Sequence, residues 1–199
     1  MRKKILLLCY AAAAAVYLLG SLGLLCWDAF LYATGRMAPV ELSLQDVETW
    51  DLSVTADDLA VCVGNDPQLL WNAAGQRVRS VYYRLQKPAT GDVALYYTEV
   101  GQTDFSKKQI VLAPFGETQE LLYKLPAGKS YHRIRLDVSS LAGEELVFES
   151  IVVNCRLPAG AYFVRTLPQW CALAFYPLLA ACAVIWLMET AEAWKERRG

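Results

Sequence analysis

Residues 5–27 read ILLLCYAAAAAVYLLGSLGLLCW, a run of 23 residues without a charged side chain. Arg2-Lys3-Lys4 precede this run and Asp28 follows it. A helix that spans the hydrocarbon core of a bilayer needs roughly 20 apolar residues at about 1.5 Å each. We therefore predict that residues 1–33 form a cytoplasmic tip and a first transmembrane helix, and that the rest of the chain folds from this anchor.

A cleaved signal peptide is the alternative interpretation, because it also combines a basic start with an apolar stretch. The run exceeds the roughly 7–15 apolar residues of a typical signal peptide. No small-x-small cleavage site appears before the bulky residues Trp27, Phe30 and Tyr32. Both observations favour a retained anchor.

A second run of 19 uncharged residues covers Trp170–Met188. Trp170, Trp186 and Trp194 lie near its edges, where aromatic rings favour the headgroup layer. Pro177 falls inside the run, and membrane-spanning helices tolerate proline with a kink. We predict that residues 161–199 form a second transmembrane helix and a cytoplasmic tail. A buried helix of a soluble protein is the alternative.

The basic residues predict the orientation of these spans. MRKK precedes the first span and WKERR follows the second, and Lys and Arg near span ends favour the cytoplasm. Both termini are thus expected in the cytoplasm of a cell-membrane protein in contact with lipid, with residues 34–160 on the other side. The net charge of −1 and the lack of a basic stripe with interleaved aromatics argue against nucleic acid as a partner.

Residues 34–160 repeat one pattern, a short apolar or alternating run followed by a turn cluster rich in Gly, Pro, Asn and Asp. In residues 133–138, Ile134 and Leu136 share one side with Val138, and charged residues share the other, as in a strand with one buried face. The predicted strands lie near Trp50–Val54, Leu59–Val63, Gln68–Trp71, Arg77–Leu85, Val93–Val100, Gln109–Leu112, Glu120–Leu125, Tyr131–Val138 and Glu145–Val153.

Nine short strands without a helical period indicate a mainly β domain. Both ends of this domain lead into spans, so the chain must enter and leave it at the same end. A jelly-roll-like antiparallel β-sandwich flanked by two transmembrane α-helices meets that demand, because its terminal strands are neighbours.

The central region contains two cysteines, Cys62 and Cys155. On an oxidising side of the membrane they can form a disulfide between an early strand and the last one. Two buried free thiols are the alternative, because sequence spacing does not give the Cα separation that a bridge requires.

Short motifs in this region resemble the galactose-binding-like jelly roll. They are Gly64-Asn65-Asp66-Pro67, Val81-Tyr82-Tyr83, Ala94-Leu95-Tyr96-Tyr97, Ile134-Arg135-Leu136-Asp137 and Phe148-Glu149-Ser150-Ile151. More narrowly, the chain resembles jelly-roll ectodomains attached to bacterial membrane proteins that build or modify surface polysaccharides. The resemblance covers residues 46–154 and implies a carbohydrate-binding-like sandwich. The chain has no multi-span catalytic membrane domain, so glycosyl transfer is not carried over.

The sequence offers no catalytic set. His132 is the only histidine, and no GxSxG, GxGxxG, GxxxxGK[ST] or HExxH motif accompanies it. There is no CxxC and no Cys/His cluster, so a zinc site is not expected. We therefore predict a protein that is not an enzyme and has no cofactor.

The candidate ligand-binding residues are Asn65, Asp66, Trp71, Tyr83 and Tyr96. Asn65 and Asp66 form an Asx-Pro turn with Pro67, which structure alone can explain. A rim contact to a sugar is the functional alternative, and calcium a weaker one, because this loop offers only two ligating side chains. Aromatic rings can stack on the C–H faces of sugars, and in a sandwich about half of them fill the core. The further aromatic candidates are Trp50 and Tyr123.

The leading hypothesis is a binding or accessory module in cell-surface glycan assembly, with glycan and a membrane protein of polysaccharide assembly as partners. The alternative is a structural subunit that scaffolds a larger membrane complex. An enzyme of unknown type ranks last.

Overall fold

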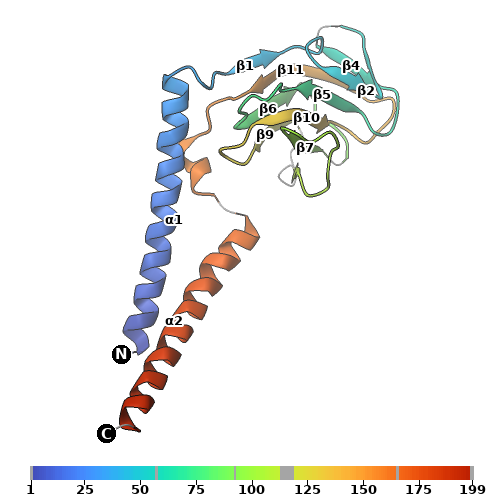
Figure 1. Ribbon diagram of the computed structural model, residues 1–199. Coiled ribbons are helices and arrows are strands. Elements are labelled where there is room, and N and C mark those ends of the chain that lie inside the picture. The colour runs from blue at the N-terminus through green and yellow to red at the C-terminus, as the bar shows by residue number, and fades with distance from the viewer. Residues whose placement is uncertain (1, 57, 92, 113–118, 165, 198–199) are drawn as a thin grey trace. The chain divides into compact units, whose positions relative to one another are not determined.

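The computed structural model describes residues 2–56, 58–91, 93–112, 119–164 and 166–197. The chain divides into two compact units, a central one of residues 31–157 and a terminal one that combines residues 1–30 with residues 158–199. The central unit is built of strands and the terminal unit of helices (Figure 1).

Two long helices dominate the terminal unit, α1 (Arg2–Ala33) and α2 (Leu167–Glu196). Each contains an 18-residue window of mean hydropathy 2.2. Both are therefore long and apolar enough to cross a membrane, which agrees with the two predicted apolar helices. A capping box of Thr166 and Gln169 begins α2, because the first amides of a helix have no partner within it.

Polar groups join the two helices within this unit. The Tyr10 hydroxyl donates to the carbonyl oxygen of Ala174 at 2.6 Å. Near the other end of α1, the buried carboxylate of Asp28 accepts a hydrogen bond of 2.8 Å from the hydroxyl of Tyr162. Tyr162 closes a short 3-10 helix, Ala159–Tyr162, that precedes α2. These bonds therefore connect α1 to α2 and to the short helix that precedes α2.

Eleven strands are present in the described part of the central unit. They are β1 (Val40–Leu42), β2 (Glu48–Trp50), β3 (Leu52–Val54), β4 (Leu59–Cys62), β5 (Gln68–Asn72), β6 (Ser80–Leu85), β7 (Ala94–Glu99), β8 (Ile110–Leu112), β9 (Glu120–Lys124), β10 (Tyr131–Asp137) and β11 (Glu145–Val153). Two antiparallel sheets result. The first has the order β3-β4-β11-β6-β9 with β1 also on β11, and the second has the order β2-β5-β10-β7-β8.

The strand order is that of a jelly roll. Among the eight strands from β4 to β11, one sheet has the order β4-β11-β6-β9 and the other the order β5-β10-β7-β8. This is the arrangement of a jelly roll, in which eight strands form two Greek keys. Apolar side chains from the facing sides of both sheets form one core between them. In β10, Ile134 and Leu136 point into this core and Arg135 points away, as the alternation predicts.

The predicted run Trp50–Val54 is wrong in one respect, because it forms two strands that belong to different sheets. Asp51 has a φ of 52°, and this left-handed residue turns the chain from β2 of the second sheet into β3 of the first. The strand β1 lies outside all nine predicted runs. The other eight predicted runs correspond to β4–β11.

Cys62 and Cys155 are free thiols, so the predicted disulfide is not formed. The backbone amide of Cys62 donates to Glu144, next to the start of β11, whereas Cys155 follows the end of that strand. A nine-residue strand spans roughly 25–30 Å, far beyond the Cα separation of about 7 Å that a disulfide tolerates. The length of β11 therefore keeps the two thiols apart.

Candidate functional site

The outward side of the second sheet carries an ordered set of polar and aromatic side chains, which we call the polar face. Strand register assigns its members. One row across the strands contains Trp50, Gln68, Asp137, Ala94 and Leu112, and the next contains Glu48, Leu70, Arg135, Tyr96 and Ile110. Asn72, Arg133 and Thr98 form a third, shorter row. Side chains of successive rows project from the same side because strand side chains alternate with a period of two.

Arg135 lies at the centre of the polar face and is held from several directions. Its Nε and Nη2 atoms donate to the two carboxylate oxygens of Asp137 at 2.6 and 2.8 Å. Nη2 also lies 3.6 Å from Oδ1 of Asp66. The hydrogen bonds to Asp137 are the main cause of a raised pKa of the guanidinium, so Arg135 stays charged.

Two aromatic rings flank this guanidinium. Its Cζ atom lies 4.8 Å from the ring centroid of Tyr96 and 6.0 Å from that of Phe105. Phe105 stands on the loop between β7 and β8, and Cζ of Arg133 lies 5.8 Å from the same ring. Cations at such distances from aromatic rings are attracted to them. The contacts therefore fasten the β7–β8 loop onto the polar face.

Trp50 supplies the most accessible aromatic ring of the polar face. It lies on the edge strand β2, and 65% of its surface is exposed. Its partner in the register is Gln68, whose Nε2 donates to Oδ2 of Asp66 at 2.5 Å. An exposed flat ring thus stands beside amide and carboxylate groups that the protein has already oriented.

The candidate residues from the sequence occupy different environments. Asn65 and Asp66 lie exposed in the turn before β5, and Asp66 reaches the network of Arg135. Tyr96 is half-buried on the polar face. The structure therefore brings Asp66 and Tyr96 together through one guanidinium.

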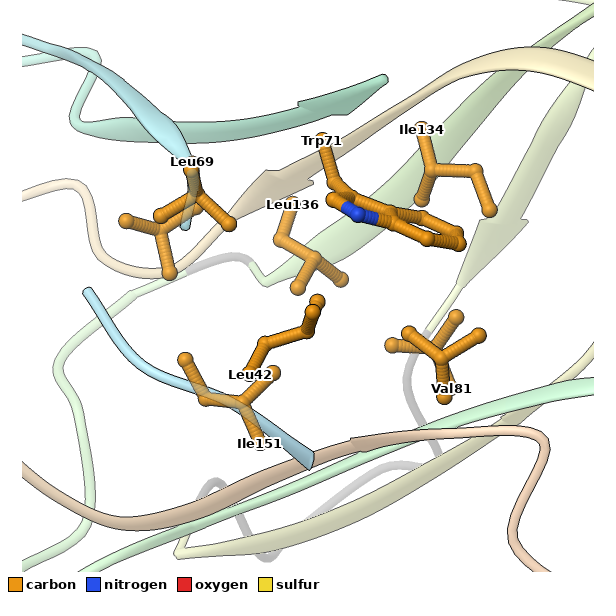
Figure 2. Close-up of a pocket in the computed structure, with 9 residues that line it drawn as sticks. Leu42, Leu69, Trp71, Val81, Ile134, Leu136 and Ile151 are labelled. Atoms are coloured by element: carbon orange, nitrogen blue, oxygen red, sulfur yellow. The ribbon is translucent and has the colours of Figure 1, made fainter. Parts of the chain in front are cut away.

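Trp71 and Tyr83 face the core of the sandwich and not the polar face, so both are corrected as ring platforms. Trp71 points inward and lines the sandwich core together with Val81 and Ile134 (Figure 2). Tyr83 is completely buried, and Tyr123 is buried against it with ring centroids 6.2 Å apart. The alternation of side chains in β5, β6 and β9 places Trp71, Tyr83 and Tyr123 on the core side of their strands.

Sequence reasoning missed the main polar members of the site. The sequence places Arg133, Arg135 and Asp137 on the solvent-facing side of one strand and indicates no function for them. Phe105 was not singled out, because its contact to the sheet depends on how a loop folds back. The alternation of three charged residues opposite a fully apolar side was the available signal.

The charges of the polar face nearly cancel. Arg133 faces Glu48 with an Nη2–Oε2 distance of 3.6 Å, and Arg135 faces Asp137 and Asp66. Within the described residues, no three His, Cys, Asp or Glu side chains converge in a way that could hold a metal ion. The face therefore offers hydrogen-bonding groups and rings rather than a metal centre.

No protein-family model matches the sequence, and the comparison with curated proteins found no match. Among solved structures, the chain is similar to a low-affinity xylan-binding module, CBM86, from Roseburia intestinalis, with 13% identity and a TM-score of 0.41 over 62% of this chain and 98% of that chain. A family 29 carbohydrate-binding module from Piromyces equi gives 8% identity and a TM-score of 0.39 over 58% of this chain and 90% of that one.

A carbohydrate-binding module from lichenase 5A of Cellvibrio mixtus, solved with cellotriose, gives 14% identity and a TM-score of 0.26 over 60% of this chain and 98% of that chain. Similarity at these identities, with TM-scores no higher than 0.41, does not define a ligand or an activity for this chain.

Proposed function

We propose that this chain is a non-enzymatic two-span membrane protein that displays its β-sandwich outside the cytoplasm and binds glycan through the polar face. It would serve as a binding or accessory module in cell-surface glycan assembly. The helices α1 and α2 are the proposed spans, with both termini in the cytoplasm, as the basic residues at the two tips favour.

The exposed ring of Trp50 beside the oriented groups of Gln68 and Asp66 is the observation that carries the proposal. Carbohydrate recognition needs a flat apolar ring for the C–H faces of a sugar and fixed donors and acceptors for its hydroxyl groups. The amide of buried Gln68 holds the exposed carboxylate of Asp66 in place, so little side-chain entropy is lost when a sugar binds Asp66.

The size of the polar face suits an oligosaccharide rather than a single sugar. Five strands lie side by side from β2 to β8, and adjacent strands are about 4.8 Å apart. The row from Trp50 to Leu112 therefore crosses four inter-strand spacings, or roughly 19 Å. Trp50 and Leu112 are the exposed members of this row and stand at its two ends, so the accessible apolar groups are an oligosaccharide's length apart.

The test uses the full chain in lipid nanodiscs on a glycan array, followed by calorimetry with the glycans retained. Trp50→Ala is expected to weaken binding by about tenfold or more, since ring stacking contributes on the order of 1–3 kcal/mol. Tyr82→Ala is the matched control, because Tyr82 is a half-buried ring on the outward side of the other sheet. Equal affinity of Trp50→Ala and the unmodified chain would contradict the proposal.

A scaffold subunit of a membrane complex is the second candidate. It is favoured by an apolar groove of about 630 Å³ in the helical unit, lined by small residues that include Ala12, Ala13, Ala172 and Ala180. Small residues allow close approach of helices in a bilayer. This function predicts that exchange of the two helices for unrelated spans abolishes the cellular role, whereas Trp50→Ala leaves it unchanged.

A further inference from the structure

We infer that the glycan selected by the polar face is uncharged, and that glycans bearing carboxylate, sulfate or phosphate groups are rejected. This inference rests on the proposed function and specifies its ligand class. It follows from how the two arginines of the face are already engaged.

The Nε–Nη2 edge of Arg135 is already occupied by a carboxylate, and a second carboxylate lies beside Nη2. A guanidinium recognises a carboxylate or phosphate through two parallel N–H donors, and Arg135 already uses Nε and Nη2 on Asp137. The rings of Tyr96 and Phe105 lie near its Cζ atom, and only 22% of the Arg135 side chain is exposed. A glycan anion that binds this edge would have to displace Asp137, an internal partner that is part of the same strand.

Arg133 is also engaged. Its guanidinium lies 3.6 Å from the Glu48 carboxylate and contacts the Phe105 ring. Its side chain is 34% exposed, whereas that of Glu48 is 79% exposed. An approaching ligand therefore meets the carboxylate before it meets the cation.

The carboxylates of the network outnumber its guanidiniums, and two of them, Glu48 and Asp66, are more exposed than the arginines they face. Glu48, Asp66 and Asp137 face Arg133 and Arg135, and the Asp66 side chain is 60% exposed. Exposed carboxylates accept hydrogen bonds from sugar hydroxyl groups but repel anionic substituents. The same arrangement thus binds neutral sugars and excludes charged ones.

The experiment compares matched pairs of polysaccharides, each a neutral polymer and the same polymer after oxidation of its C6 hydroxymethyl groups to carboxylates. Binding to the full chain in zwitterionic nanodiscs is measured at low ionic strength. We expect the neutral member of a bound pair to have at least about tenfold higher affinity, because the oxidised member places like charges beside the exposed carboxylates. Equal or tighter binding of the oxidised member would overturn the inference while upholding glycan binding.

Absence of binding to any pair would instead remove the proposed function, and the inference with it. The two failures are therefore distinguishable in one data set.

A second test removes the carboxylate partners of Arg135 and looks for a gain in the binding of oxidised polymers. Asp137→Asn removes the charge that engages the guanidinium, and we expect this variant to bind oxidised polymers that the unmodified chain rejects. Asp66→Asn provides a milder form of the same change at an exposed residue, in case Asp137→Asn does not fold. If neither variant binds oxidised polymers although at least one of them folds, the inference is contradicted.

Glu149→Gln is the matched control for these variants. Glu149 pairs with Arg84 on the outward side of the first sheet, with an Nε–Oε2 distance of 2.9 Å. Its substitution also frees an arginine and changes the net charge by the same amount. Binding of oxidised polymers by Glu149→Gln would show that net charge alone, and not Arg135, determines the selectivity.

Discussion

Val40 pairs with Val153 across the antiparallel ladder of β1 and β11, so the first and last strands of the sandwich are direct neighbours. The hydroxyl of Tyr32 reinforces this junction by donating to the carbonyl oxygen of Cys155 at 3.0 Å. The chain therefore enters and leaves the central unit at one end. The Asn65-Asp66 turn lies at the opposite end, because β4, which precedes this turn, ends beside the beginning of β11.

A jelly roll closed in this way can be carried by two spans that leave the membrane on the same side. We predict that a membrane-impermeant maleimide labels Gln76→Cys in intact cells, whereas Lys3→Cys reacts only after permeabilisation. Both positions are exposed, so access alone distinguishes them. The unmodified chain gives the background of its native cysteines. The reverse labelling pattern would refute the proposed orientation.

Trp50 and Trp71 form a matched pair for stability. Trp50 points outward from an edge strand, and Trp71 points into the core from the neighbouring strand. Trp71→Ala is expected to destabilise the sandwich by about 2–4 kcal/mol, because it leaves a void among packed apolar side chains. Trp50→Ala should change stability by no more than about 0.5 kcal/mol.

Amide hydrogen exchange of the sandwich in the full chain measures both variants, since protection of core strands reports their opening free energy. Similar losses of protection in the two variants would contradict the assigned directions of the rings.

Position 64 must be a glycine because the side chain of Asp51 occupies the place of a Cβ atom. A Cβ atom at position 64 would lie 2.1 Å from Oδ2 and 2.3 Å from Cγ of Asp51. We expect Gly64→Ala to destabilise the sandwich by about 1–3 kcal/mol, as in other overpacked sites. Asp51→Gly should restore most of this loss, because glycine removes the clash and accepts the φ of 52° at that position. Additive effects in this double-mutant cycle would show that the two positions do not interact.

Asn154 fixes the end of β11 through its side chain and its backbone. It is buried with a φ of 56°, its Oδ1 accepts from the amide of Arg79 at 2.7 Å, and its Nδ2 donates to the carbonyl of Arg77 at 3.0 Å. Asn154→Ala should cost about 2–4 kcal/mol, from unpaired buried groups and a strained backbone. Asn154→Gly should cost about 1 kcal/mol less, because only the hydrogen bonds are lost.

Thermal midpoints of the full chain in detergent compare these two variants. A glycine variant that is less stable than the alanine variant would argue against a backbone contribution.

The burial of Tyr83 and Tyr123 predicts that the sandwich loses stability at alkaline pH. Both hydroxyls are buried and lack a hydrogen-bond partner among the described residues, and burial raises the pKa of both phenols. In the unfolded chain they ionise near pH 10, so the unfolded state binds fewer protons above that pH. Stability from these groups is intact below about pH 10 and falls as the pH rises further, by up to about 1.4 kcal/mol per pH unit for each group.

The variant with Phe at both positions should show a shallower alkaline decline than the unmodified chain. At neutral pH it should be as stable or more stable by up to about 1 kcal/mol for each hydroxyl removed. Urea unfolding at pH 7 and at pH 11 measures both effects. An unchanged alkaline slope in the double variant would contradict the assignment of these phenols.

The sequence by itself determined the two long apolar helices, eight of the strands and the division into a strand-rich centre between them. Hydrophobic run length and the alternation of side chains are local properties, so Ile5–Trp27 and residues 133–138 reveal their structure without knowledge of their neighbours. The demand that both ends of the sandwich meet also predicted its jelly-roll closure, now seen in the pairing of β1 with β11.

Only the tertiary structure decided which aromatic rings face outward, that Trp50–Val54 divides between two sheets, and that Cys62 and Cys155 lie at opposite ends of β11. It also decided that Asp66, Tyr96 and Phe105 meet around Arg135. These relationships depend on register and on the path of loops, and each joins residues from different strands. A local pattern carries no record of such pairings, because their free energy arises only when the sheets assemble.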